Sequence, residues 1–172
     1  MNRIIPYYAA SDFQKSLSGD TSKFVRGQPV IGLINIVNEY GGTQQGKIAA
    51  LYAGNCFLPL GKANEAIKYF EKALKSDGKI IQVGANAGLG AAYEMLLDFK
   101  SAVKYYEQAS ELSENDEIKY RYVYYTALCY EKAGNKEMAE KKYREVIDEP
   151  KYLSEFNKFA RIGLTRLGTI IE

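Results

Sequence analysis

The sequence contains no histidine and no tryptophan, and it has only two cysteines and four prolines. Without histidine the chain lacks the commonest general base and the commonest protein ligand for transition metals. The two cysteines, Cys56 and Cys129, are 73 positions apart, so no CxxC pair is present for a zinc site or a redox motif. We therefore expect no metal site, no cofactor and two reduced cysteines that act as small apolar side chains.

Long apolar runs and an excess of one charge are missing as well. No stretch of about 18 apolar residues is present, as a membrane-spanning helix requires, so we expect no direct insertion of this chain into a membrane. The 23 basic and 21 acidic residues leave a net charge of +2, which gives no field for steering towards nucleic acid. The chain has 172 residues, of which 47% are hydrophobic. That length is enough for one domain with a core.

Three segments of the chain repeat one pattern. Each has a small residue, an alanine 12 positions later and an aromatic residue four positions after that: Gly54, Ala66 and Phe70; Gly90, Ala102 and Tyr106; Ala127, Ala139 and Tyr143. The alanines are 36 and 37 positions apart. A constant gap within units of slightly variable length is typical of stacked helix pairs, because loops tolerate changes in length. The small residues allow two helices to cross closely, and the ring fills the space between them.

These repeats resemble the tetratricopeptide repeat, which has a period of about 34 residues. The resemblance covers residues 44–150 and is clearest over 60–74. It departs from the family in lacking the opening tryptophan and in ending only the last unit with a proline, Pro150. The resemblance implies an all-α fold, a right-handed superhelical solenoid of antiparallel helix pairs, that acts as a non-catalytic, protein-binding scaffold.

We expect a single domain over residues 1–172 with about three full repeats. An irregular first repeat (1–43) contains a loop at 20–31, and it precedes repeats at 44–78, 79–114 and 115–150 and a capping helix at 151–172. Within the first repeat, the segment 7–17 is predicted to hold the end of one helix and the start of a second. Further helices are predicted at 32–40, 44–58, 63–76, 80–96, 99–113, 116–133, 136–147 and 153–169.

The irregular beginning carries a second resemblance. The interrupted first repeat, followed by the segments 39–46 and 51–56, is similar to bacterial envelope proteins that have one N-terminal membrane anchor and a soluble tetratricopeptide domain. Some of those proteins accompany the Sec translocon. The resemblance implies a bacterial envelope or secretion-associated complex and an extracytoplasmic location, with the cytoplasm as the alternative. Because the first helix begins so near the second, we also expect residues upstream of Met1 in the native protein.

In such a solenoid the first helix of each pair lines the concave side. The inward positions that the core does not use are predicted to bind the partner: Leu51, Asn55, Leu58, Glu94, Met95, Arg121, Tyr124, Leu128 and Glu131. This mixture of apolar, aromatic and polar groups suits an extended segment or a helix of a partner protein. Two alternatives remain open: half-buried packing for some of these tyrosines, and self-association into a homo-oligomer through Tyr120–Tyr125 or an exposed edge repeat.

One well-known function of the family, the binding of chaperone C-termini, does not fit this sequence. Tetratricopeptide domains that hold the C-terminal carboxylates of chaperones use a clamp of lysines, arginines and asparagines on the inner helices. Asn55 matches a clamp asparagine and Arg121 a clamp cation, but the other clamp columns hold Leu51, Gly88 and Tyr125. The sequence therefore predicts that the chain does not bind the tails of cytosolic chaperones.

Two motifs imitate catalytic sites. The segment 41–48 nearly spells a phosphate-binding loop, but Ile48 lacks the hydroxyl that would hold magnesium, and we interpret Thr43 as the cap of the next helix. Glu94 and Glu131 suggest a carboxylate pair, yet no nucleophile or metal ligand accompanies them in the sequence. We therefore predict no catalytic residues and no enzymatic activity.

Overall fold

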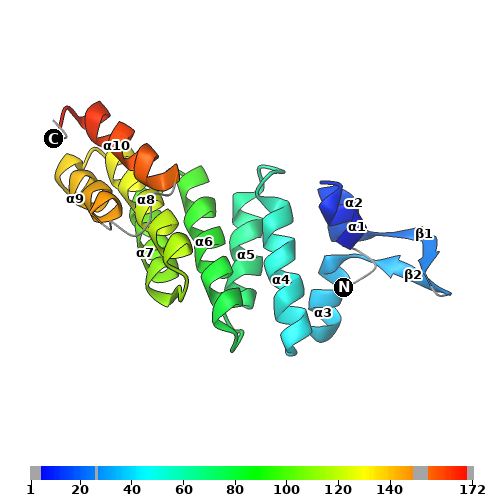
Figure 1. Cartoon of the computed structure of the whole chain (residues 1–172). Coiled ribbons are helices and arrows are strands. Elements are labelled where there is room, and N and C mark those ends of the chain that lie inside the picture. Colours follow the sequence, from blue (N-terminus) through cyan, green and yellow to red (C-terminus); the bar gives the residue numbers. More distant parts are fainter. Residues whose placement is uncertain (1–4, 26, 149–154, 170–172) are drawn as a thin grey trace. The chain divides into compact units, whose positions relative to one another are not determined.

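The computed structural model describes residues 5–25, 27–148 and 155–169, and Figure 1 shows their arrangement. Helices predominate, with one small hairpin near the N-terminus. In chain order the elements are α1 (Ile5–Ala9), α2 (Phe13–Ser18), β1 (Gly19–Val25), β2 (Gln28–Ile31), α3 (Leu33–Tyr40), α4 (Gln44–Phe57), α5 (Ala63–Ala73), α6 (Lys79–Met95), α7 (Phe99–Leu112), α8 (Asp116–Lys132), α9 (Lys136–Ile147) and α10 (Glu155–Leu167). The contacts divide the chain into two compact units, residues 1–92 and 93–172.

The helices from residue 44 onwards confirm the predicted helix pairs, with ends that differ by at most three residues. The segment 155–167 of the predicted capping helix is helical, whereas Pro150 and residues 151–154 lie outside the described residues. None of the described helices is long and apolar enough to span a membrane.

The prediction of a loop at 20–31 is wrong, because this segment forms the antiparallel hairpin β1–β2. Its Gly, Ser, Asp and Thr content is typical of a loop, and a bulge between Asp20 and Phe24 removes the alternation that marks a strand. Among the residues of this segment whose burial the structure describes, only Val30 is buried, whereas Phe24 is 65% exposed. Since the hairpin contributes so little to the core, hydrophobic periodicity does not reveal it.

Two glycines allow the base of the hairpin to form. Gly19 has a φ of +84°, which favours glycine, and a Cβ atom on Gly32 would lie 2.0 Å from the carbonyl oxygen of Leu17. The chain therefore passes from α2 into β1 and from β2 into α3 with its backbone segments in close contact. The Tyr7 hydroxyl donates a hydrogen bond of 2.9 Å to Asp20 and so ties α1 to the hairpin.

In the first unit the predicted ring-and-glycine packing is confirmed at Phe70. The ring is fully buried, and Cβ atoms on Gly54 of α4 and Gly88 of α6 would lie 2.5 Å and 2.3 Å from its carbon atoms. Ala66 and Ala73, on the same face of α5, are also fully buried. Three helices thus meet around one ring because α4 and α6 present glycine to it.

The second unit repeats this packing with tyrosine. The Tyr143 ring of α9 is fully buried, and a Cβ atom on Gly163 of α10 would lie 2.5 Å from it. The ring belongs to a core cluster from α8, α9 and α10 that also contains Val123, Ala127, Ala139, Val146, Phe156, Ala160 and Leu164. The helix α10 therefore completes the core of α8 and α9, as a capping helix should.

Short polar side chains cap five of the described helices, and Asp12 does so at α2. Thr43 Oγ1 accepts a hydrogen bond of 3.1 Å from the backbone N–H of Gly46, which confirms its predicted capping role. Asp98, Asn115 and Asn135 cap α7, α8 and α9 in the same way. Gly46 meets the end of α3 closely, since a Cβ atom there would lie 1.9 Å from the Tyr40 carbonyl oxygen. Gly46 in segment 41–48 thus has a structural role.

The turn between the two helices of each repeat has a left-handed residue at the same position. Gly61 and Gly134 fill it with φ of +71° and +78°, whereas the middle repeat has Leu97 with φ of +59°. Leu97 is 73% exposed, so its side chain gains little from burial. A leucine in this conformation is unusual and strained.

Candidate protein-binding surface

An aromatic surface joins α8 to α10 in the second unit. The ring centroid of Tyr124 lies 5.6 Å from that of Phe156 and 6.0 Å from that of Phe159. Phe156 is buried, Tyr124 is half-buried and Phe159 is 39% exposed. We call Tyr124, Phe156, Phe159 and the adjacent Arg121 the α8–α10 aromatic surface. Rings at these separations attract each other, which holds Phe159 in place although much of it faces solvent.

Arg121 extends the α8–α10 aromatic surface with a cation. Its guanidinium carbon lies 5.4 Å from the centroid of the Phe156 ring, and its Nη2 atom is 3.9 Å from the Glu117 carboxylate. Its Nε atom is buried and has no hydrogen-bond partner among the described residues. The guanidinium is thus oriented by stacking and retains an unused donor.

The two predicted carboxylates are each held by a tyrosine and a cation. Glu94 accepts hydrogen bonds from the Tyr106 hydroxyl at 3.1 Å and from Lys132 at 2.5 Å. Glu131 accepts from the Tyr143 hydroxyl at 2.6 Å and from the guanidinium of Arg166 at 2.6 Å. Each carboxylate therefore neutralises its own cation and satisfies one buried hydroxyl, and the two do not form a catalytic pair.

The same pairing explains why the first repeat has no glutamate at the equivalent position. The tyrosine stands 12 positions after the glutamate in both cases, and at the equivalent positions the first repeat has Leu58 and Phe70. A phenylalanine has no hydroxyl to satisfy, so a leucine can replace the carboxylate. The sequence carried this signal as a repeated Glu–Tyr spacing, but the roles of Tyr106, Tyr143 and Arg166 were missed.

The pKa shifts of these groups indicate a structural role and not a role in proton transfer. Hydrogen bonds from Arg166 and, to a lesser extent, Tyr143 lower the pKa of Glu131 against the effect of burial. Burial raises the pKa of Tyr106 and Tyr143 far above the usual tyrosine value, and the facing carboxylates raise it further. The carboxylate thus stays ionised and the hydroxyls stay neutral near pH 7.

The predicted residues of the first unit contact other parts of that unit. Leu51 faces Gly84 of α6, where a Cβ atom would lie 3.3 Å from its Cδ2 atom. Burial raises the pKa of Tyr8 of α1, and the nearby Asn55 side chain opposes that rise; the Tyr8 ring lies 4.9 Å from that of Tyr52. Leu58 is half-buried.

Some of the predicted residues of the second unit are exposed, and others pack against neighbouring helices. Met95 is 47% exposed and Glu94 is half-buried. Arg121, Tyr124 and Glu131 contact α10, and Leu128 packs against the same core cluster. The structure therefore brings four of the nine predicted residues to α8 and the face that it shares with α10. Phe159, an exposed residue of this surface, was missed because α10 was interpreted only as a cap.

The tyrosines at 120–125 are half-buried. Tyr122 stacks on Tyr106 with a centroid separation of 6.3 Å, and the tilted ring of Tyr125 lies 5.5 Å from that of Tyr106. Tyr120, Tyr124 and Tyr125 pack against the core cluster of the second unit. Much of this aromatic area is therefore used within the unit itself.

Both cysteines are buried and free, as predicted. Burial raises the pKa of Cys56 to about 11 and that of Cys129 to about 12, so neither forms a thiolate near neutral pH. Among the described residues no group of three acidic or cysteine side chains is placed to hold a metal ion.

Models of the tetratricopeptide repeat match residues 53–80, 83–116 and 122–151, together more than half of the chain. The chain belongs to the tetratricopeptide repeat family. The three matches lie over successive helix pairs of the structure. Tetratricopeptide repeats serve in general as scaffolds for protein–protein interaction and are typically non-catalytic, so protein partners follow from the family.

The chaperone clamp of some tetratricopeptide domains is further weakened by the packing. Gly88 faces the Phe70 ring, and Tyr125 lies 5.5 Å from Tyr106 and 6.1 Å from Phe156. Arg121, which matched a clamp cation, is stacked on Phe156. The residues at these clamp columns thus pack against neighbouring side chains.

Proposed function

We propose that this tetratricopeptide protein is a non-catalytic scaffold whose first helices line a concave face that binds a segment or helix of a partner protein. The observation that supports this most is the α8–α10 aromatic surface, where Phe159 is exposed beside a stacked Arg121 with a free Nε donor. Aromatic residues and arginine are the side chains that contribute most to protein interfaces. Met95 would extend this surface within the second unit, and Leu51, Asn55 and Leu58 are proposed to bind the partner in the first unit.

Affinity would come from apolar burial around Phe159 and Tyr124. The partner would supply an acceptor for the outer end of the Arg121 guanidinium, since that side chain is 39% exposed. Glu94, Leu128 and Glu131 would support the binding face indirectly, since their own contacts hold α8 and its neighbours in position.

The test compares affinity capture by wild type with capture by Phe159→Glu and Met95→Glu, from a lysate of the source cells with membranes included. Ile80→Glu is the matched control, because Ile80 is 85% exposed and lies on the same helix, α6, as Met95. We expect a protein that wild type and the control retain and both other variants lose. Equal capture by all four proteins would place the binding site elsewhere.

Self-association is the alternative function. It would use Tyr120–Tyr125, and sedimentation equilibrium would reveal it as a mass that rises with concentration. A constant monomer mass favours binding to a different protein, whereas a dimer that Tyr124→Ala dissociates would favour self-association.

We further propose that the scaffold acts in a bacterial envelope or secretion-associated complex. This proposal depends on the resemblance of the interrupted first repeat and segments 39–46 and 51–56 to anchored envelope proteins. Fractionation of the source cells tests it: recovery in the envelope or periplasmic fraction supports the proposal, and recovery in the cytosol alone contradicts it.

A further inference from the structure

Helix α10 exposes two large apolar side chains next to each other. Phe159 is 39% exposed and Ile162 is 50% exposed, and at three positions apart they are neighbours on the helix surface. The opposite face of α10, with Phe156, Ala160 and Leu164, belongs to the core of the second unit. The outer face of a capping helix is ordinarily polar. The exposed apolar pair is therefore not needed for the core and is available to a partner.

Basic side chains flank this apolar pair. At 3.6 residues per turn, Lys158 lies about 40° from Ile162 around the helix, on the side away from Phe159, and Arg161 lies on that same side. Both cations are exposed. Arg161 donates a hydrogen bond of 3.2 Å to the Asn157 side chain, and neither cation forms an ion pair with a residue that the structure describes. Two positive charges beside the apolar pair thus have no counter-charge in the described part of the chain.

The acidic residues closest to this face leave it basic. Glu131 of α8 neutralises Arg166, and Glu155 stands in the first turn of α10, where the partial positive charge of the helix end favours a carboxylate. With three basic residues and one acidic residue, α10 has a net charge of +2, which is the net charge of the whole chain. The exposed face of α10 is thus basic in a chain whose other charges balance.

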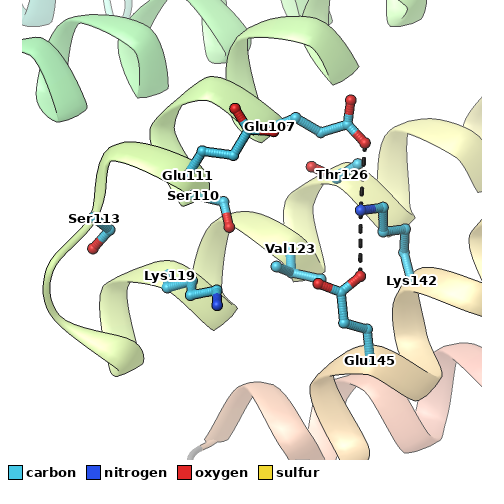
Figure 2. A pocket seen from close by; sticks show the side chains of 9 residues that line it. All are labelled: Glu107, Ser110, Glu111, Ser113, Lys119, Val123, Thr126, Lys142 and Glu145. Carbon is cyan, nitrogen blue, oxygen red and sulfur yellow. Dashed lines mark ion pairs between the residues drawn. The ribbon is translucent and has the colours of Figure 1, made fainter.

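The cations in the pocket among α7, α8 and α9 are arranged differently. Figure 2 shows Lys142 between Glu107 and Glu145, at 3.4 Å and 3.3 Å. Lys119 and Glu111 also line this pocket, which has a volume of about 370 Å³. Basic and acidic side chains are thus mixed there. The two unpaired cations of α10 have no such neighbours and lie beside exposed apolar side chains instead.

We propose that the partner segment bound at the α8–α10 aromatic surface is an acidic amphipathic helix that lies along α10, an inference that rests on the proposed function. Its apolar side chains would cover Phe159 and Ile162, and its carboxylates would face Lys158 and Arg161. Helices that bind in this way present apolar side chains three and four positions apart, which matches the spacing of the exposed pair. Opposite charges around an apolar contact accelerate association and disfavour basic competitors.

A second copy of this chain fits the face less well. A symmetric pair of α10 helices would cross between Phe159 and Ile162, so that each residue contacts the other in the second copy. Lys158 and Arg161 of both copies would then approach one two-fold axis, where like charges repel. Nucleic acid is disfavoured too, because Ile162 occupies the middle of the face and the rest of the chain has no net charge to attract phosphate.

The test is fluorescence anisotropy of a labelled, stapled helical peptide titrated with the whole chain. The peptide has leucine at every third or fourth position and glutamate on both sides of that stripe. Matched peptides replace each glutamate by glutamine or by lysine, and a labelled single-stranded oligonucleotide tests nucleic acid. The variants are Ile162→Ser and the double reversal Lys158→Glu with Arg161→Glu. Lys136→Glu with Lys141→Glu is the control for an equal charge change at exposed positions of α9. Circular dichroism verifies that each variant is folded.

We expect the glutamate peptide to bind at least tenfold more tightly than the glutamine peptide, with an affinity that falls as salt is added. The double reversal in α10 should weaken binding of the glutamate peptide about tenfold and allow the lysine peptide to bind. Ile162→Ser should lose a few-fold, since apolar burial is removed. The α9 control should bind as wild type does.

Four results would each overturn the inference. They are equal binding of the three peptides, tighter binding of the lysine peptide or the oligonucleotide by wild type, undiminished binding after the double reversal in α10, and absence of saturable binding of the glutamate peptide. Failure of the proposed function has a different sign, which is a captured partner that Phe159→Glu retains. A partner that Phe159→Glu loses and the double reversal retains would remove only the acidic helix.

Discussion

Glu131 shows how single residues of this chain couple a repeat to the next helix. Its carboxylate accepts from Tyr143 on α9 and from Arg166 on α10, and its side chain is only 18% exposed. The arginine bond is the main reason that the pKa of Glu131 is lowered. Because the folded pKa lies below the unfolded value of about 4.3, this carboxylate stabilises the fold above that value. The contribution is lost as the pH falls through the folded pKa.

We therefore predict that acid destabilises wild type more than Glu131→Gln. Urea unfolding at pH 7 should show a loss of about 1–2 kcal/mol in Glu131→Gln, since a buried hydrogen-bonded charge is removed. At pH 3 the difference between the two proteins should shrink. The control Glu140→Gln removes an exposed ion pair with Arg144 and should change stability by less than about 0.5 kcal/mol. Identical acid dependence in wild type and Glu131→Gln would contradict this role.

Leu97 leads to a second prediction at the residue scale. The two equivalent turns use Gly61 and Gly134, whereas the left-handed leucine is strained and mostly exposed. Leu97→Gly should raise the free energy of unfolding by about 1 kcal/mol. The reverse change, Gly134→Ala, should lower it by a similar amount, because open space around Gly134 leaves only the backbone effect. A destabilised Leu97→Gly would show that the leucine makes a contact that outweighs its strain.

At the scale of the elements, glycine determines how closely the helices approach. Gly54→Ala and Gly88→Ala should each destabilise the protein by about 1–3 kcal/mol, since the new methyl group would overlap the Phe70 ring. Gly42→Ala is the control, with nothing within 4 Å of the added atom. Thermal unfolding measures all three. Unchanged stability in Gly88→Ala would mean that the ring has room to move.

The helices could be predicted from the sequence and the hairpin could not, for a physical reason. Ala66, Phe70 and Ala73 recur at helical spacing because each helix buries one face, and this periodicity is visible in the sequence. In the strands β1 and β2, Val30 is the only buried residue among those whose burial the structure describes. Their pairing depends on the close backbone approach at Gly19 and Gly32, which residue patterns do not display.

The predicted binding residues illustrate a related limit. Helical spacing identified which side chains of α8 leave the core of their own pair, and Arg121, Tyr124 and Glu131 do so. The sequence did not show that α10 contacts these same side chains, because that contact joins residues more than 30 positions apart. Surfaces between successive helices depend on such long-range contacts, so exposed partners such as Phe159 emerged only from the structure.

For the whole molecule, the broken clamp gives a direct prediction about partner class. A peptide ending in Glu-Glu-Val-Asp should show no saturable binding in fluorescence anisotropy up to about 1 mM, which corresponds to a free energy weaker than about −4 kcal/mol. The columns at Leu51, Gly88 and Tyr125 offer it no cation. Binding of this peptide that Arg121→Ala abolishes would refute the prediction.

The central claim is that partner binding occurs on the face that includes Phe159, and photo-crosslinking in the source cells tests it most directly. Phe159 is replaced by p-benzoylphenylalanine, an aromatic side chain that preserves the ring, and the same replacement at Tyr40, which is 50% exposed on α3, is the control. The account predicts one major adduct of defined mass from position 159 after irradiation and none of that mass from position 40. Absence of an adduct at 159, or the same adduct from both positions, would contradict a binding site on the α8–α10 aromatic surface.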